Sequence, residues 1–556
     1  MFPGALERRI QNLVLFCLLA MTLVVTPWLS FDPINLPKFL ILGTCGFAAL
    51  GNLAPYLKRM INSQARLLVY SVLLFLLSLL VVFLLSGSGT WSQVYGAYGR
   101  NTGLLAYVGL ALMLIAVVFV SNLSFSKRLI WVLIFTGMAN AIYGFIQWSG
   151  NDPVNWNNPY DPIVGTLGNP NFVSAHLGIS GLASLALVLE SSRSLISRLI
   201  LIANVGLSLF VISQSSSSQG LLIFALGATL IFYFKFLSTL HLLVRSGYWL
   251  LVLAGSVVGT VGILNKGPLA SLLYQDSVTY RGDYWQAGWK MSLDNPLFGV
   301  GLDSYGDWYR YARTEEAALR RGPDVTSNSA HNVFLDISSN GGFLLLATYL
   351  LIFGLIFRSA IRVLKKSREF DAIGVGLVSA WVAYVIQSAI SINQLGLAIW
   401  GWVLGGAIIG YDLYRDRPDA PRLSVKKGGR PEQVPATVVL TGTLGLVIGF
   451  IVSLWPLAQD ISFRSALESG DGAKIEAAAK QFPRHNYYYI SSARILQENK
   501  IEDKALDLTR LAIASNPRDF AAWKLLAANP KISESEKAAA IAKMRELDPF
   551  NKTLEE

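Results

Sequence analysis

The sequence predicts an all-α protein: a bundle of helices that crosses a membrane many times, a large external loop, and a small helical domain at the carboxyl end. Three observations support this fold class. Of the 556 residues, 53% are apolar and only 15% are charged, a balance more apolar than that of soluble globular domains. Apolar runs long enough to cross a hydrocarbon core recur as far as Trp455. From Gln459 onward the chain is charged, rich in Ala and helical in period.

The apolar runs predict about thirteen membrane spans. The first run follows a short basic head and ends at Pro27 and Trp28 without a small-x-small cleavage pattern, so we expect a retained anchor and not a removed signal peptide. In chain order the predicted spans are residues 13–29, 36–53, 67–85, 103–120, 129–148, 172–189, 199–213, 220–234, 248–264, 333–357, 373–390, 395–411 and 438–455.

The formal net charge of +11 indicates how the chain is oriented in the membrane. When every span is counted, the Lys and Arg residues of the loops fall on one side, and the short loops on the other side carry only Lys38 and Arg100. By the positive-inside rule the basic side, with the amino terminus, is cytoplasmic. An odd number of crossings then places the loop at residues 265–330 and the tail after Trp455 on the external face. We expect no nucleic-acid partner.

These features divide the chain into an amino-terminal bundle (residues 1–264), an external loop that carries the candidate site (265–332), further membrane helices (333–456) and a helical tail (457–556). In the tail, Asn516-Pro517 and Asp548-Pro549 each close an Ala-rich helix, at a spacing that resembles tetratricopeptide repeats. Such repeats usually bind other proteins, so one expectation is a protein partner. Fewer than three clear units are visible, and a plain helical cap is the alternative.

We expect no cofactor and no metal ion. Cys17 and Cys45 both lie inside apolar runs, where a small buried side chain is the simplest explanation. The external loops contain no Cys pair, no HExxH and no Asp-x-Asp spacing.

Two external loops before residue 265 carry candidate binding residues. The stretch SGSGTWSQVYGAYGRNTG places Arg100 among glycines that allow a ligand to approach, although an Arg at this depth also serves as a headgroup anchor. Asn169 and Asn171 lie where the chain re-enters the membrane, in a segment rich in Asn, Pro and aromatics that suits sugar binding. His176 follows inside the span, where a neutral His between helices is as good an explanation as a functional one.

In the large loop, Arg281 and Trp285 lie at helical spacing and share one face of a short interfacial helix. The following NPLFGVG ends that helix with a turn back toward the membrane. Further along, Arg310 and Arg313 are among the arginines that nearly balance the acidic residues of the loop.

His331 directly precedes a span whose first turns carry Asn332, Asp336 and Asn340. A neutral imidazole there is able to accept a proton from a hydroxyl at neutral pH. Asp336 is five residues further along, a poor spacing for a contact on a regular helix. The alternative is that His331 only caps the start of the helix.

The segments RGDYWQAGWKMSLDNPLFGVGLDSYG and AHNVFLDISSNGGFLLLATYL resemble the signature region of the O-antigen ligase and polymerase family. YGRNTG, AIYGFIQWSG and GTLGNPN are similar to upstream family segments, so the resemblance covers roughly residues 80–411. It implies a GT-C-like multi-pass enzyme of the bacterial inner membrane, with a periplasmic tail. This enzyme would transfer a glycan from an undecaprenyl-diphosphate carrier to an acceptor hydroxyl, with inversion and without a metal.

The resemblance assigns His331 as the base and Arg281 as the cation that stabilises the diphosphate. The implied substrate contacts are Arg100, Trp285, Asn169, Asn171, Arg310, Arg313 and Asn332. One departure is that the family's Ser-Arg in a middle span is replaced by SQSSSSQG. Either Arg100, Arg310 or Arg313 then supplies a second positive charge, or the hydroxyls and helix amides at residues 215–220 contribute.

The acceptor stays open: lipid A core of lipopolysaccharide, a growing polysaccharide or a protein hydroxyl would serve an O-antigen ligase, a polymerase or a protein O-oligosaccharyltransferase respectively. Two other classes are alternatives. A small-anion transporter of the bicarbonate type would need broken helices or repeated halves around a midplane site, and no internal repeat is visible. A scaffold would instead recruit partners through the tail.

Overall fold

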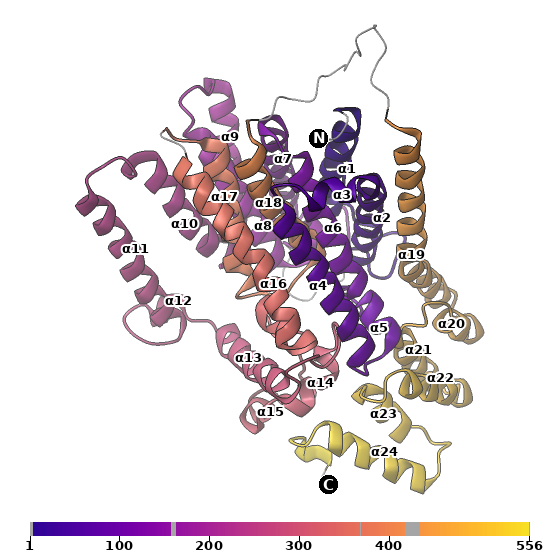
Figure 1. Ribbon diagram of the computed structural model, residues 1–556. Helices are drawn as coiled ribbons and strands as arrows, with labels where there is room; N and C mark the ends of the chain where they lie inside the picture. Colours follow the sequence, from indigo (N-terminus) through magenta and orange to yellow (C-terminus); the bar gives the residue numbers. More distant parts are fainter. Residues whose placement is uncertain (1–3, 157–162, 367–368, 417–433, 555–556) are drawn as a thin grey trace.

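The computed structural model describes residues 4–156, 163–366, 369–416 and 434–554, and all regular structure in these ranges is helical (Figure 1). The basic stretch at residues 417–430 and part of the external segment at residues 157–162 lie outside the described residues. The long helices are α1 (Gly4–Leu23), α2 (Asn35–Leu53), α4 (Arg66–Leu85), α6 (Leu104–Val120), α7 (Leu123–Trp148), α8 (Pro170–Val188), α9 (Leu195–Gln214), α10 (Gln219–Phe232), α11 (Leu242–Ile263), α16 (Val333–Lys366), α17 (Ala372–Ser388), α18 (Leu395–Tyr414) and α19 (Ala436–Ser469).

Each predicted span overlaps one of these helices, and the prediction of a polytopic helical membrane protein is confirmed. Within the described ranges, ten helices are long and apolar enough to cross a membrane, and α6 and α17 are shorter apolar helices. α1 carries Glu7, Arg8 and Arg9 near its start and is not among the ten. The count of thirteen stays a prediction.

α18 is the centre of the bundle, because it packs against α1, α6, α16 and α17 and is buried along its whole length. Trp400 and Trp402 lie in this core with at most 2% of their surface exposed. α11 is the opposite case: only 6% of its apolar window is buried, and it stands at the edge of the bundle in Figure 1. Such a helix is stable only with an apolar solvent around it, as in a bilayer.

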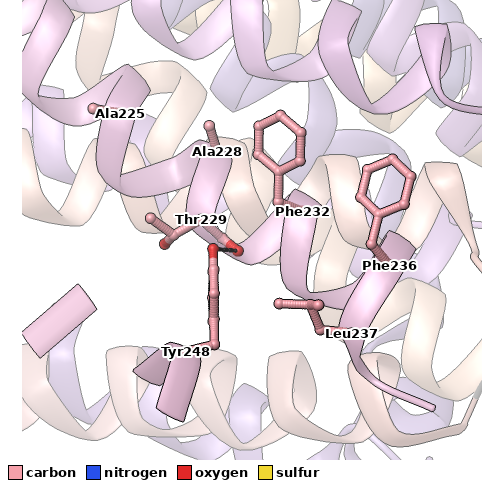
Figure 2. A pocket seen from close by; sticks show the side chains of 7 residues that line it. All are labelled: Ala225, Ala228, Thr229, Phe232, Phe236, Leu237 and Tyr248. Atoms are coloured by element: carbon pink, nitrogen blue, oxygen red, sulfur yellow. Dashed lines mark hydrogen bonds between the residues drawn. The ribbon is translucent and has the colours of Figure 1, made fainter. Parts of the chain in front are cut away.

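An apolar cavity of about 380 Å³ separates α11 from the end of α10 (Figure 2). Tyr248 crosses it, and its hydroxyl donates a hydrogen bond of 2.8 Å to the carbonyl of Thr229. The remaining lining side chains are apolar: Ala225, Ala228, Phe232, Phe236 and Leu237. Apart from the hydroxyl of Tyr248, which is already hydrogen-bonded, the cavity offers no ionisable group.

The external loop and the tail gather at one end of the bundle, opposite to the amino terminus (Figure 1). The loop forms α12 (Ala270–Leu273), α13 (Asp276–Asp294), α14 (Tyr305–Ala312) and α15 (Glu315–Arg321), and α5 (Thr90–Tyr95) lies at the same end. The tail forms α20 (Gly472–Ala479), α21 (Asn486–Glu498), α22 (Glu502–Ser515), α23 (Phe520–Ala527) and α24 (Glu534–Leu547).

α19 joins the bundle to the tail as one continuous helix through Pro456, so the expected boundary after residue 456 falls inside a helix. α21 packs with α22 and α23 packs with α24, which makes two successive helical hairpins. The extension of α19 is fixed by Asp460, whose carboxylate accepts hydrogen bonds from the hydroxyls of Tyr98 (3.0 Å) and Tyr488 (2.9 Å). It also accepts one from the backbone N–H of Asp32 (2.9 Å), so the tail is tied to two external loops of the bundle.

Candidate active site

α13 crosses the start of α16 at close range because Gly288 has no side chain. A Cβ at this position would lie 3.0 Å from Cγ of Leu335 and 3.3 Å from Cβ of Ala330. One turn further, the hydroxyls of Ser292 and Ser338 share a hydrogen bond of 2.9 Å. The external helix that carries Arg281 is therefore fixed against the residues that surround His331.

The NPLFGVG turn docks into a break in α16. Gly342 has a φ of 72°, a left-handed conformation that interrupts the helix and frees carbonyls on the preceding turn. The N–H of Val300 donates to the carbonyl of Ser339 at 2.8 Å, and the N–H of Gly301 donates to that of Asn340 at 3.0 Å. The predicted turn is confirmed, and the break explains why a glycine stands at position 342.

The same break positions α14. The side-chain oxygen of Asn340 accepts hydrogen bonds from the N–H groups of Ser304 and Tyr305, both at 2.9 Å. The hydroxyl of Tyr305 in turn donates to the carbonyl of Tyr284 on α13 at 2.7 Å. α13, α14 and the head of α16 thus form one framework.

His331 lies at the entrance to α16 in a left-handed conformation, with a φ of 53°. Its N–H donates to the hydroxyl of Ser329 at 3.0 Å. That hydroxyl donates to the carboxylate of Asp336 at 2.7 Å, which also accepts the N–H of Ala330 at 2.7 Å. The sequence spacing indicated that Asp336 is a poor partner for the imidazole. The structure shows that Asp336 instead holds the backbone turn that presents His331.

The helix cap is Asn332 and not His331. The side-chain oxygen of Asn332 accepts the N–H of Leu335 at 3.1 Å, the usual contact of an N-cap residue. The alternative explanation of His331 as the cap is therefore wrong. The sequence also predicts that Asn332 contacts substrate. Because its side-chain oxygen already accepts the cap hydrogen bond, the same side chain would have to make both contacts.

The imidazole of His331 stacks on Tyr284, with ring centroids 5.1 Å apart. Tyr284 is three residues after Arg281 on α13, so both side chains lie on one face of that helix. Arg321, at the end of α15, covers the ring of Tyr280 at 4.1 Å and bonds to the hydroxyl of Tyr284. In the part of the chain that the structure describes, neither Arg281 nor Arg321 has a carboxylate partner.

This surrounding keeps the imidazole neutral. Burial, together with the positive charges of Arg281, Arg100 and Arg321, lowers the pKa of His331 from 6.5 to about 3. Burial also lowers the pKa of Arg281, which nevertheless remains a cation at neutral pH. The site therefore combines a neutral proton acceptor with two guanidinium groups.

Arg100 lies in a different position from the one expected. It is 5% exposed and sits between two buried carboxylates, 3.4 Å from Asp303 and 3.6 Å from Asp336. It also donates to the carbonyl of Asn328 at 2.6 Å. Because two carboxylates already match its charge, Arg100 supports the turn at His331, and its role as a substrate contact stays a prediction.

Arg310 and Arg313 are also paired, since both bind the carboxylate of Asp548 in the tail, at 2.9 and 2.7 Å. Arg313 is only 2% exposed. These ion pairs show a structural role for both arginines, and the predicted contact of Arg310 or Arg313 with substrate stays a prediction. All three predicted candidates for a second cation are thus paired with carboxylates, whereas Arg321 lies against Tyr280 and Tyr284 near His331.

The remaining predicted contacts are Trp285, Asn169 and Asn171. Trp285 is 38% exposed on α13, next to Tyr284. Asn169 is the N-cap of α8, with its side chain accepting the N–H of Asn171 at 2.9 Å. At the start of α10, the hydroxyl of Ser217 is bonded to that of Ser174 at 3.0 Å. No described contact joins these groups to the Arg281–His331 pair.

Sequence reasoning missed Tyr284 and Arg321. Tyr284 had a usable signal, because it follows Arg281 at the i+3 spacing that shares a helix face. Arg321 had none, since its distance from Tyr284 depends on how the loop folds back.

Comparison with known proteins identifies a family domain in this region. The family model described as O-Antigen ligase matches residues 178–350, which run from α8 into α16 and include α13, α14 and His331. The search of curated proteins finds no match.

Proposed function

We propose that this chain, which contains an O-antigen ligase domain at residues 178–350, is a membrane enzyme of the glycosyltransferase type that moves a glycan from an undecaprenyl-diphosphate carrier to an acceptor hydroxyl at the outer face of the bacterial inner membrane. The observation that carries the proposal is the pairing of a neutral His331 with two guanidinium groups that have no carboxylate partner in the described chain. An acid–base group and an anion site are what a lipid-diphosphate donor requires.

The proposed reaction is a single displacement. The imidazole of His331 takes the proton of the acceptor hydroxyl as its oxygen bonds to the anomeric carbon, and the bond from that carbon to the diphosphate breaks with inversion. The leaving diphosphate keeps the electron pair, and Arg281 and Arg321 stabilise its charge. Because the leaving group is good and the clamp is cationic, we expect no need for a metal.

The low pKa of His331 fits this sequence of events. Without donor, the nearby cations and burial leave the imidazole a weak base. A bound diphosphate would offset the positive charges of Arg281 and Arg321 and raise the pKa toward the neutral range, where general bases are most effective. Donor binding would thus prepare the base for the acceptor.

The orientation supports this placement. The loop helices lie at the end of the bundle opposite to the amino terminus, which the charge pattern assigns to the cytoplasm (Figure 1). A broken helix such as α16 is also a feature of transporters, where the freed backbone groups bind the transported ion. Here the carbonyls that the break at Gly342 frees accept hydrogen bonds from Val300 and Gly301 instead. The break therefore gives no support to ion transport.

The proposal is tested by incubating the purified protein with an undecaprenyl-diphosphate-linked oligosaccharide and three acceptors: lipid A core, the same oligosaccharide and a protein. Product with one of them, lost in the His331→Asn variant, supports the proposal and identifies the acceptor class. Equal product formation by the variant would refute the role of His331.

A further inference from the structure

The two Asx-Pro turns of the tail meet the same helix of the external loop. The side-chain amide of Asn516 donates to Asp307 on α14 at 2.9 Å. Asp548 accepts from Arg310, on the same helix, and from Arg313, directly after it. Asn516 follows α22 and Asp548 follows α24, so the two turns are equivalent ends of successive hairpins, 32 residues apart (548 − 516).

Between these turns, arginine side chains make cation–π contacts with aromatic rings across the interface of α14 and the tail. The guanidinium of Arg518 lies 3.4 Å from the ring centroid of Trp308, and that of Arg310 lies 4.2 Å from the ring centroid of Phe520. α14 is thus held along its length by one face of the tail, in the way a repeat domain holds a helical ligand.

The same arginines reach beyond α14 to the segment that leads to His331. Arg313 donates to the carbonyls of Pro323 and Val325, both at 3.3 Å, and Arg310 donates to that of Pro323 at 2.5 Å. These carbonyls belong to the stretch of chain between α15 and His331. The carboxylate of Asp548 therefore holds the guanidiniums of Arg310 and Arg313 in place. These two groups in turn hold the backbone segment that leads to His331.

The ion pair between Arg313 and Asp548 is buried, so its loss should strongly affect this interface. The side chains of Arg313 and Asp548 are 1% and 0% exposed. A buried guanidinium that loses its carboxylate is strongly destabilised, so either Arg313 leaves the interface or the interface opens to water. Both outcomes release the carbonyls of Pro323 and Val325.

We propose that the tail binds α14 as an intramolecular ligand, and that Asp548 is a positioning residue for the segment carrying His331. The inference rests on the proposed function for its effect on catalysis but not for the contact itself. According to this proposal, α14 occupies the side of the tail that faces the loop, and this side is therefore not a free surface for a separate protein.

The contact is tested by limited proteolysis of the intact protein in detergent. Trypsin cuts after Arg320 and Arg321, directly before the loop segment that the contact of Asp548 with Arg310 and Arg313 holds in place. Asp548→Ala should raise the cleavage rate there by at least about tenfold, because proteolysis follows the population of the open form. Asp548→Glu should restore most of the protection. Lys552→Ala is the matched control, since Lys552 pairs with Glu315 at the same interface but is 59% exposed, and it should change little. Unchanged cleavage in Asp548→Ala would overturn the proposal.

The positioning role is tested by kinetics on the folded fraction. Asp548→Ala should lower kcat at least about tenfold with a smaller rise in the KM for the lipid-linked donor, because the released segment leads to the base and begins directly after Arg321, one of the two proposed donor cations. A short thiol-to-thiol linker between Glu315→Cys and Lys552→Cys should then recover kcat in the Asp548→Ala background. The native Cys17 and Cys45 are buried and will not compete.

Different results would contradict the positioning role of Asp548 and the proposed transferase function. An equal fall of kcat in the tethered and untethered proteins, or a rise in KM alone, would contradict the positioning role. Full activity of His331→Asn would contradict the proposed function, and the proteolysis result would still decide whether the tail holds α14.

Discussion

The ring of His331 stacks on that of Tyr284 with an angle of 26° between their planes, and this contact joins the entrance of a membrane helix to an external helix 47 residues earlier (331 − 284). It places the imidazole beside the helix face that carries Arg281. Substitutions at the base, at the cations and at their supports should therefore have different and separable effects.

His331→Asn should lower the transfer rate by about two to four orders of magnitude, the usual contribution of a general base. Asn is the best replacement because it tolerates the left-handed conformation that His331 adopts with its φ of 53°. The fold should therefore persist, as checked by thermal unfolding in detergent. Wild-type turnover in a folded His331→Asn protein would leave the imidazole without a catalytic role.

The stability of the protein should depend on the charge state of His331. Its pKa is about 3 when folded and near 6.5 when unfolded, so the unfolded state binds the extra proton between these values. The contribution is fully present above about pH 6.5 and is lost as the pH falls toward 3. Denaturant titrations from pH 7 to pH 4 should show a smaller loss of stability for His331→Asn than for the wild type. Parallel curves for the two proteins would argue against the shift.

Arg281→Met should raise the pKa of His331, because Arg281 is the first of the charges that lower it. The same change removes a donor-binding cation, so KM should rise together with a fall in kcat. Arg281→Lys and Arg321→Lys should each recover only part of the activity, since a point charge does not reproduce two parallel hydrogen bonds to a diphosphate. NMR titration of labelled His and donor kinetics measure the two effects. Lys variants with full activity would refute the bidentate contact.

Arg100→Met should destabilise the protein by about 3–5 kcal/mol, because it leaves the buried carboxylates of Asp303 and Asp336 without their cation. The Met side chain keeps most of the volume, so the loss comes from charge. Thermal unfolding measures it, with Lys290→Met as the control, because the Lys290–Asp294 pair is exposed. If the variant unfolds like the wild type but fails to bind donor, Arg100 is a ligand after all.

Topology should follow the charge pattern. A reporter that is active only in the cytoplasm should be silent when fused after Asn265 or at Glu556 and active when inserted within residues 415–430. The reverse pattern would place His331 on the cytoplasmic face and contradict the proposed donor.

Sequence patterns predicted the helical membrane fold well, because the signal for a span is local: a window of apolar residues of the right length reports its own environment. The turn at NPLFGVG was also predicted, from glycine and proline chemistry, whereas the roles of Arg281 and His331, which the family resemblance implies, stay predictions. The sequence did not predict the break at Gly342, because it depends on hydrogen bonds from Val300 and Gly301 to the carbonyls of Ser339 and Asn340, which lie about 40 residues away in the chain.

What the sequence by itself determined, then, was the apolar spans, the sidedness of the charge and the residue types of the site. The tertiary structure decided which charges are free. Arg313 and Asp548 are 235 residues apart in the chain yet 2.7 Å apart in space. Arg100, Arg310 and Arg313 looked as available as Arg281, because a guanidinium carries the same charge whether or not a carboxylate lies against it. Whether that charge can bind a ligand depends on the nearest carboxylate in three dimensions, and only the folded chain fixes that distance.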